Sequence, residues 1–170
     1  MDSLKWFDYQ LRSTLDGFLW SVQQVPEGRW HAFPPAQLGE WSAAQHIFHM
    51  IHYEKKLALP SMYQWLGAPP AVREEVDEET WDNPPPIEVM LDQFKVVRLA
   101  EIDLLPNFDE MAWRSTRETT IWGEVSLYWL VCKTYQHTLD HTQNILRLAL
   151  FWDRVLTRMS REQTTSGDGS

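Results

Sequence analysis

Two of the six histidines in this 170-residue chain have the spacing of a metal-binding pair. His137 and His141 are four residues apart, so on a helix they lie on one face with their Cβ atoms about 5–6 Å apart. At that separation both imidazoles can bind a single ion. Because such pairs also arise by chance, the meaning of this one depends on the surrounding sequence.

The surrounding sequence predicts that both imidazoles face a protein core. An apolar stripe with steps of three or four residues runs through the same segment, at Leu127, Leu130 and Thr134, then Ile145, Leu148, Trp152 and Val155. The steps in between fall on His137 and His141. Two adjacent buried imidazoles are costly unless their polar atoms are satisfied, and a shared metal ion satisfies both. The alternative is a pair of core histidines that hydrogen-bond to neighbouring side chains or carbonyl groups.

A metal site needs at least a third protein ligand, and a second predicted helix offers three candidates. These are His46, His49 and His52. That helix is apolar nearly all round, so its periodicity does not choose among them. Three neutral imidazoles would suit Zn²⁺, Ni²⁺ or another borderline cation and leave a position open for water or substrate. An ion in such a site can lower the pKa of bound water or activate a thiol.

Helical spacing of apolar residues predicts the elements that position these histidines. The expected helices cover residues 3–25, 41–58 (or on to 65), 87–105 and 124–155. Proline-rich segments separate them, and the long connection over 67–86 carries an acidic run that we interpret as a solvated loop. A four-helix bundle is the most economical all-α arrangement.

We expect a single bundle domain over residues 1–158, followed by a polar, disordered tail over 159–170. The net charge of −9 argues against nucleic-acid or anionic-membrane binding. The chain has no apolar run long enough to span a membrane and no signal-like N-terminus, so a cytoplasmic setting is expected. A single cysteine, Cys132, excludes an intrachain disulfide and Cys₂ or Cys₄ zinc sites, and is more typical of core packing than of a nucleophile.

Three segments resemble motifs of the DinB/YfiT-like superfamily, in an order and spacing that cover most of the chain. One is WSAAQHIFH at residues 41–49, in which a histidine follows a tryptophan by eight residues. Another is HTLDHTQNI at 137–145, with the histidine pair followed by a glutamine and an aliphatic residue. The third is WGEVSL at 122–127, which is similar to the short approach to that helix. One departure is Gln45, where the family usually has an acidic residue.

The resemblance implies a four-helix bundle that holds a divalent metal ion with His49, His137 and His141. It thereby selects one histidine of the second helix and leaves His46 and His52 as flanking residues. Members of the superfamily include metal-dependent transferases that act on low-molecular-weight thiols such as bacillithiol and mycothiol, and others have been treated as hydrolases. Many related bundles form dimers, so the resemblance also implies a homodimer.

The expected function is therefore thiol transfer to a small electrophilic substrate at a three-histidine metal site. Metal-dependent hydrolysis of a small substrate is the main alternative, and the others are a non-catalytic metal- or ligand-binding bundle and a metal-free interaction bundle. We expect Asp140 to face solvent, because it points about 100° away from His141. Tyr53 and Glu54 are expected at the surface or in packing rather than at a pocket mouth.

Overall fold

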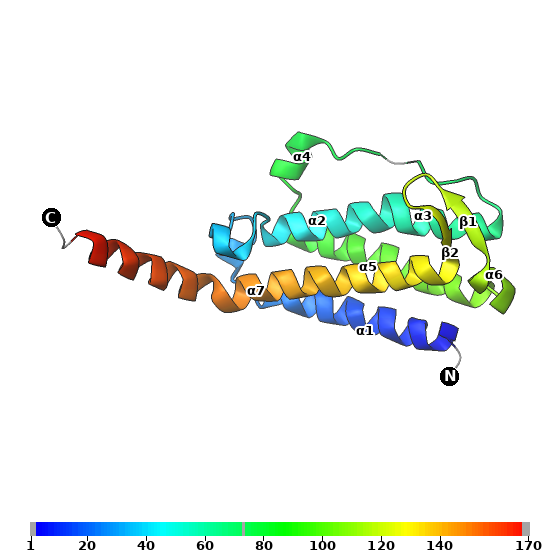
Figure 1. Ribbon diagram of the computed structural model, residues 1–170, viewed down its shortest axis with the longest axis horizontal. Helices are drawn as coiled ribbons and strands as arrows, with labels where there is room; N and C mark the ends of the chain where they lie inside the picture. The colour runs from blue at the N-terminus through cyan, green and yellow to red at the C-terminus, as the bar shows by residue number, and fades with distance from the viewer. Residues whose placement is uncertain (1–2, 73, 168–170) are drawn as a thin grey trace.

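The computed structural model describes residues 3–72 and 74–167, which are mostly helical with one small sheet (Figure 1). The long helices of this part of the chain are α1 (Ser3–Gln23), α2 (Ala43–Tyr53), α5 (Ile87–Leu104) and α7 (Leu127–Gly167). The short helices are α3 (Leu59–Met62), α4 (Glu78–Asp82) and α6 (Glu110–Arg114). The strands are β1 (Thr116–Thr119) and β2 (Gly123–Ser126).

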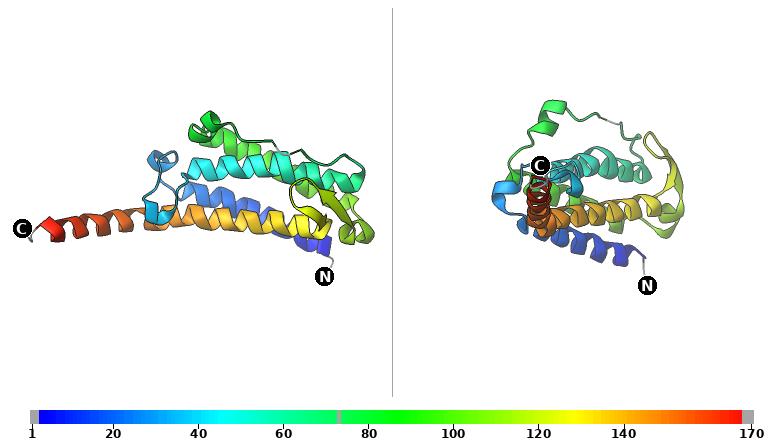
Figure 2. Two further views of the ribbon diagram at one scale, coloured as in Figure 1. Left: turned by 45° about the horizontal axis from the view of Figure 1, so that its top comes forward. Right: turned by 60° about the vertical axis from the view of Figure 1, so that its left-hand side comes forward.

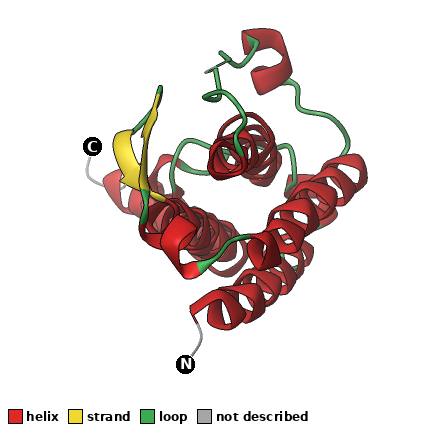
Figure 3. Cartoon of the chain, turned by 90° about the vertical axis from the view of Figure 1, so that its right-hand side faces the viewer, coloured by secondary structure: helices red, strands yellow, loops and turns green. Residues whose placement is uncertain are grey.

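The four long helices lie side by side along one axis, as the view close to that axis shows (Figure 3). Helix α1 packs against α5 and α7, and α2 packs against the same two helices. The predicted long connection between the second and third long helices is present and contains α4. Within the described residues, no helix is both long enough and apolar enough to cross a membrane.

Helix α2 begins at Ala43, and the preceding residue, Ser42, caps its N-terminus. The Ser42 hydroxyl oxygen accepts a hydrogen bond from the Gln45 backbone N–H (3.2 Å), and the Gln45 side-chain oxygen accepts one from the Ser42 N–H (2.9 Å). This reciprocal arrangement is a capping box, which satisfies two backbone donors that the first helical turn leaves free. Glutamine at position 45 therefore performs the capping that a glutamate would perform.

The second helix follows the longer of its two predicted extents. After α2 the chain forms a π-helical segment (Glu54–Ala58), then α3, then a 3₁₀ turn (Tyr63–Leu66). Pro60 lacks an N–H, and its ring would crowd the carbonyl group four residues earlier in a regular α-helix. The wider π turn precedes this proline and relieves the conflict, so the helical path continues to Leu66 instead of ending near residue 58.

The connection before the last helix departs from the all-α prediction. Residues 106–123 contain α6 and part of a β-hairpin, so the fold is not strictly all-α. The hairpin is antiparallel and pairs Thr116 with Ser126 and Thr119 with Gly123. Gly123 has a φ of 68°, a conformation that favours glycine at the tight turn. Because β2 occupies residues 123–126, α7 begins at Leu127 and not near Glu124.

The prediction for the acidic connection needs a smaller correction. It is largely exposed, as a solvated loop would be, but residues 78–82 form α4. The Asp77 carboxylate accepts a hydrogen bond from the Thr80 backbone N–H (3.0 Å), which caps this short helix.

The last helix is longer than the predicted extent to about residue 155. It continues to Gly167 and projects beyond the other helices (Figure 2). Helix α7 thus overlaps most of the segment predicted to be a disordered tail, while residues 168–170 lie outside the described residues. No proline or glycine interrupts the sequence between 127 and 166, which is compatible with a continuous helix. The domain boundary at residue 158 stays a prediction.

A buried polar layer divides the apolar core into two clusters. One cluster includes Phe18, Ile47, Phe94 and Ile145, and the other includes Leu11, Met62, Ile102 and Leu127. On each long helix the polar residues of this layer stand between the residues of the two clusters: Thr14 on α1, Glu54 at the end of α2, Arg98 and Glu101 on α5, and Thr138 on α7.

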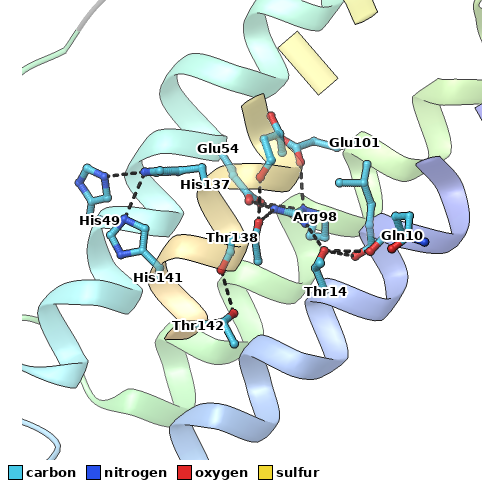
Figure 4. Close-up of polar contacts among 12 residues, drawn as sticks. Gln10, Thr14, His49, Glu54, Arg98, Glu101, His137, Thr138, His141 and Thr142 are labelled. Atoms are coloured by element: carbon cyan, nitrogen blue, oxygen red, sulfur yellow. Dashed lines mark hydrogen bonds and ion pairs between the residues drawn. The ribbon is translucent and has the colours of Figure 1, made fainter. Parts of the chain in front are cut away.

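The centre of this layer is the Arg98 guanidinium, which is fully buried and contacts all four helical segments (Figure 4). Its Nε donates to Glu101 Oε2 (3.1 Å) and to Glu54 Oε2 (3.3 Å), and its Nη2 also pairs with Glu54 Oε1. Nη2 donates to Thr138 Oγ1 (2.7 Å) and Nη1 to Thr14 Oγ1 (3.4 Å). A buried charge is tolerated only when it is paired in this way.

The layer contains two carboxyl groups for one guanidinium, so ionisation of both would leave a buried negative charge without compensation. Burial, and then the negative charge of Glu54, raise the pKa of Glu101 well above its usual range. The pKa of Glu54 is also raised by burial, but Arg98 opposes that effect. Glu101 Oε1 is buried without a hydrogen-bond partner in the described structure, whereas both Glu54 oxygens face Arg98. We therefore assign the proton to Glu101.

This assignment predicts that Glu101→Gln removes part of the dependence of stability on pH. Because folding raises the pKa of Glu101, the folded state holds a proton above pH 4.5 that the unfolded state has lost. The contribution of this group to the free energy of unfolding therefore decreases as the pH rises through the folded pKa. Urea unfolding of wild type and Glu101→Gln between pH 4.5 and 8 should show wild type losing stability relative to the variant as the pH rises. The exposed Glu110→Gln variant is the control. A difference that does not change with pH would contradict a protonated Glu101.

Candidate metal centre

Three imidazole nitrogens from two helices converge at one point between α2 and α7. His49 lies on α2, and His137 and His141 lie one turn apart on α7. The Nε2 atom of His137 is 3.1 Å from His49 Nε2 and 3.2 Å from His141 Nε2. Figure 4 shows the three rings pointing toward one another. The structure thus brings together the three residues that the family resemblance implies as metal ligands.

The separations of these nitrogens fit a bound metal ion. With zinc–nitrogen bonds of about 2.0–2.1 Å and tetrahedral geometry, two ligand nitrogens lie about 3.3 Å apart. The His137–His49 and His137–His141 separations are within a few tenths of an ångström of that value, and one ligand atom from each of the three histidines lies within 4.8 Å of the others. His137 also has a buried Nδ1 without a partner among the described residues, so the polar contacts of this ring are made by Nε2.

The electrostatics of the cluster favour neutral imidazoles, which is the form that binds metals. Burial is the main cause in each case and lowers the pKa of His49 to about 4, that of His137 to about 3 and that of His141 to about 2. Neighbouring histidines lower these values further, because two adjacent imidazolium charges repel each other. At neutral pH all three rings therefore offer a lone pair, and an all-nitrogen donor set of this kind suits Zn²⁺ or Ni²⁺.

The other two histidines of the second helix lie outside the cluster. His52 Nε2 is 3.1 Å from the Glu74 carbonyl oxygen, in the connection that follows the helix. His46 is buried, and its Nδ1 is 2.9 Å from His141 Nδ1, on the opposite edge of that ring from the converging nitrogens. The resemblance implies that His46 only flanks the site, whereas the structure places it in direct contact with His141.

Aromatic rings enclose the cluster at both ends. Trp41 lies 5.0 Å from the His49 ring and stacks on the His141 ring at 5.9 Å with an interplanar angle of 20°. At the other end the Tyr53 ring is 4.1 Å from the His137 ring. Tyr53 is buried, and burial raises the pKa of its hydroxyl. These rings exclude water from two sides of the site, a role that the sequence pattern did not assign to them.

The connection over 67–86 is tied to the helix that carries His49. The Gln45 side-chain nitrogen donates to the Trp81 carbonyl oxygen (3.4 Å), and the Trp81 ring lies 4.8 Å from the Trp41 ring. Earlier in the connection, Glu74 forms an ion pair with Lys56, which lies on the helical path that follows α2. Only a glutamine can both complete the capping box and donate to this carbonyl group, because a carboxylate has no donor at neutral pH. Gln45, where the resemblance implies an acidic residue, thus makes a contact that a carboxylate could not make.

The remaining predicted residues are also placed. Asp140 is exposed and accepts a hydrogen bond from the Gln136 side chain (2.8 Å), as predicted for a solvent-facing residue. Glu54 is completely buried against Arg98 and belongs to the polar layer. Of the two predicted placements, surface or packing, the structure therefore shows packing. Cys132 is half-buried at the edge of the second apolar cluster, and burial raises the pKa of its thiol, so it has the character of a packing residue.

Comparison with known proteins identifies a family. A family model described as the DinB superfamily matches residues 10–145, a span that contains the three clustered histidines and the whole polar layer. None of the curated proteins matches this chain.

The lowered histidine pKa values make a direct prediction for the metal-free protein. Long-range ¹H–¹⁵N spectra should show the imidazoles of His46, His49, His137 and His141 neutral down to about pH 5, because burial holds each pKa at about 4 or below. The unfolded state binds these protons near pH 6.5, so the contribution of these groups to stability is lost as the pH falls below that value. Titration of the four rings near pH 6.5 in the folded protein would contradict their burial as neutral groups.

Proposed function

The chain belongs to the DinB superfamily, and from that premise we propose that it is a metal-dependent enzyme that transfers a thiol to a small electrophilic substrate. His49, His137 and His141 would hold one divalent ion, zinc or nickel, through their Nε2 atoms. The observation that supports this proposal most strongly is the convergence of three neutral nitrogens at separations that match a shared ion.

Three protein ligands leave at least one coordination position free, which is typical of catalytic rather than structural zinc sites. When bound, such an ion supplies a Lewis acid that lowers the pKa of a coordinated thiol or water. The protein residues fix the three ligand rings, and Trp41 and Tyr53 keep water from their flanks. Preorganised donors of this kind need little rearrangement during the reaction.

The position of the single cysteine supports an external thiol as the nucleophile. Cys132 packs against the second apolar cluster, and its burial disfavours the reactive thiolate. The histidine cluster contains no sulfur donor. In the proposed reaction the sulfur of a low-molecular-weight thiol forms a bond to an electrophilic carbon of the substrate. The bond to the leaving group breaks, and the thiol proton is released.

The proposal takes the four long helices to be the four-helix bundle implied by the sequence resemblance, acting as a cytoplasmic homodimer. Its partners are small molecules, with no role for nucleic acid or a membrane. Hydrolysis of a small substrate is the second candidate, because the same three-nitrogen site can activate water as well as a thiol.

Metal content measured by elemental mass spectrometry tests the ligand assignment. Untagged wild type incubated with zinc or nickel and then desalted should retain about one ion per chain, as expected for one three-histidine site. His49→Ala and His137→Ala/His141→Ala should lose it while keeping wild-type helical content. His52→Ala is the matched control, because this residue lies on the same helical path but contacts the Glu74 carbonyl instead of the cluster. Wild type that stays empty with zinc, nickel and manganese would overturn the proposal.

Turnover with and without an added thiol separates the two candidate reactions. Metal-loaded wild type is expected to consume an activated aryl halide only when bacillithiol or mycothiol is present, with formation of the carbon–sulfur bond and release of halide. The His137→Ala/His141→Ala variant should reduce the rate to that of the uncatalysed reaction. Consumption of electrophilic ester or amide substrates at the same rate without a thiol would instead favour the hydrolase.

A further inference from the structure

The fourth buried histidine near the cluster faces the outer edge of one of the three converging rings. His46 lies one turn before His49 on α2, and its Nδ1 is 2.9 Å from the Nδ1 of His141. The two rings meet at 70° with centroids 5.1 Å apart. The other nitrogen of His141, Nε2, faces His137 in the cluster. His141 therefore uses its two ring nitrogens in two different directions.

The chemistry of imidazole allows one consistent arrangement of protons when His141 binds a metal ion. A neutral imidazole has one N–H and one lone pair. If the lone pair of His141 is on Nε2, its proton is on Nδ1, which then donates to the Nδ1 lone pair of His46. His46 in turn carries its own proton on Nε2. Partners behind metal-binding histidines generally fix the tautomer and the ring orientation in this manner, although carboxylate and carbonyl groups are the usual acceptors.

The surroundings of His46 hold it in this position. It is only 8% exposed, and the Trp41 ring lies 5.3 Å from its ring while also stacking on His141. Nearby on α2, Ser42 and Gln45 form the capping box, so the backbone that carries His46 is held at its N-terminal end. By contrast, His137 Nδ1 has no partner in the described structure, so the contact behind His141 is a specific feature of that ring.

We propose that His46 is a positioning residue that accepts the Nδ1 proton of His141 and thereby presents His141 Nε2 to the metal ion. This inference rests on the proposed metal site and adds a residue to it. His46 touches neither the ion nor a substrate in this arrangement, so its effect is on metal affinity. Loss of such a supporting partner typically weakens metal binding about 10–100-fold.

Two variants of similar shape separate the hydrogen bond from packing. His46→Asn places an amide oxygen close to the position of Nδ1 and keeps an acceptor, whereas His46→Leu fills similar space without one. Zinc affinity is measured by competition with a chromophoric chelator, with folding checked by circular dichroism. His46→Leu should bind zinc about 10–100-fold more weakly than wild type, and His46→Asn should recover most of the loss. Equal affinity of wild type and His46→Leu would overturn the inference, as would equal weakening in both variants.

A measurement on wild type covers the case in which a variant does not fold. Long-range ¹H–¹⁵N spectra of the zinc-loaded protein report which nitrogen of each imidazole carries the proton. The inference predicts a proton on Nδ1 of His141 and on Nε2 of His46, and a proton on Nδ1 of His46 would contradict it. Zinc-binding wild type with the wrong His46 tautomer would remove only this inference. Wild type that binds no zinc would remove the proposed function together with it.

Discussion

The buried guanidinium of Arg98 is the constraint on which the arrangement of the molecule depends. Removing this charge from water is costly, and the cost is offset only if carboxylate and hydroxyl groups surround it. Those groups come from every long helical segment: Thr14, Glu54, Glu101 and Thr138. Apolar packing alone tolerates small slips of one helix along another, whereas hydrogen bonds to a planar guanidinium have defined directions. The polar layer therefore fixes the axial positions of the helices.

The polar layer also determines the positions of the histidines in the cluster. Thr138, which contacts Arg98, is the neighbour of His137 in sequence, and Glu54 follows His49 by five residues on the same helical path. Because the layer fixes α2 against α7, it also fixes the separation between His49 and the histidine pair. The capping box at Ser42 and the Trp41 ring act from the other end of α2. The three nitrogens thus converge because the elements that carry them are held on both sides of the site.

The sequence was sufficient for the parts of this arrangement that depend on one helix at a time. The four-residue spacing of His137 and His141 and the apolar stripe around them correctly predicted their placement on one core-facing side of a helix. The choice of His49 needed the family resemblance, because α2 is apolar nearly all round and the partner helix decides which face meets the pair. Whether the three residues bind a metal stays a prediction. The contact between His46 and His141 joins two helices, and no periodicity within either one indicates it.

Other features were missed although the sequence carried a signal for them. Arg98 and Glu101 occupy steps of the apolar stripe between Phe94 and Leu105, and Glu54 occupies the corresponding step after Ile51. Charged residues at core-facing steps of two predicted helices could have indicated a buried ion pair. The hairpin had a weaker signal, because its strands are four residues long and mostly polar, and their pairing depends on the turn at Gly123. The predicted end of the last helix near residue 155 is too early, because a polar composition fits an exposed helix as well as a disordered tail.

The most direct test of the account is a crystal structure of the zinc-loaded protein with diffraction data recorded above and below the zinc absorption edge. The account predicts one anomalous peak between α2 and α7, about 2.0–2.1 Å from the Nε2 atoms of His49, His137 and His141. A loaded crystal with no peak at that position, or with its zinc bound elsewhere, such as at Cys132 or on the acidic connection, would contradict the central claim that these three histidines form the metal site.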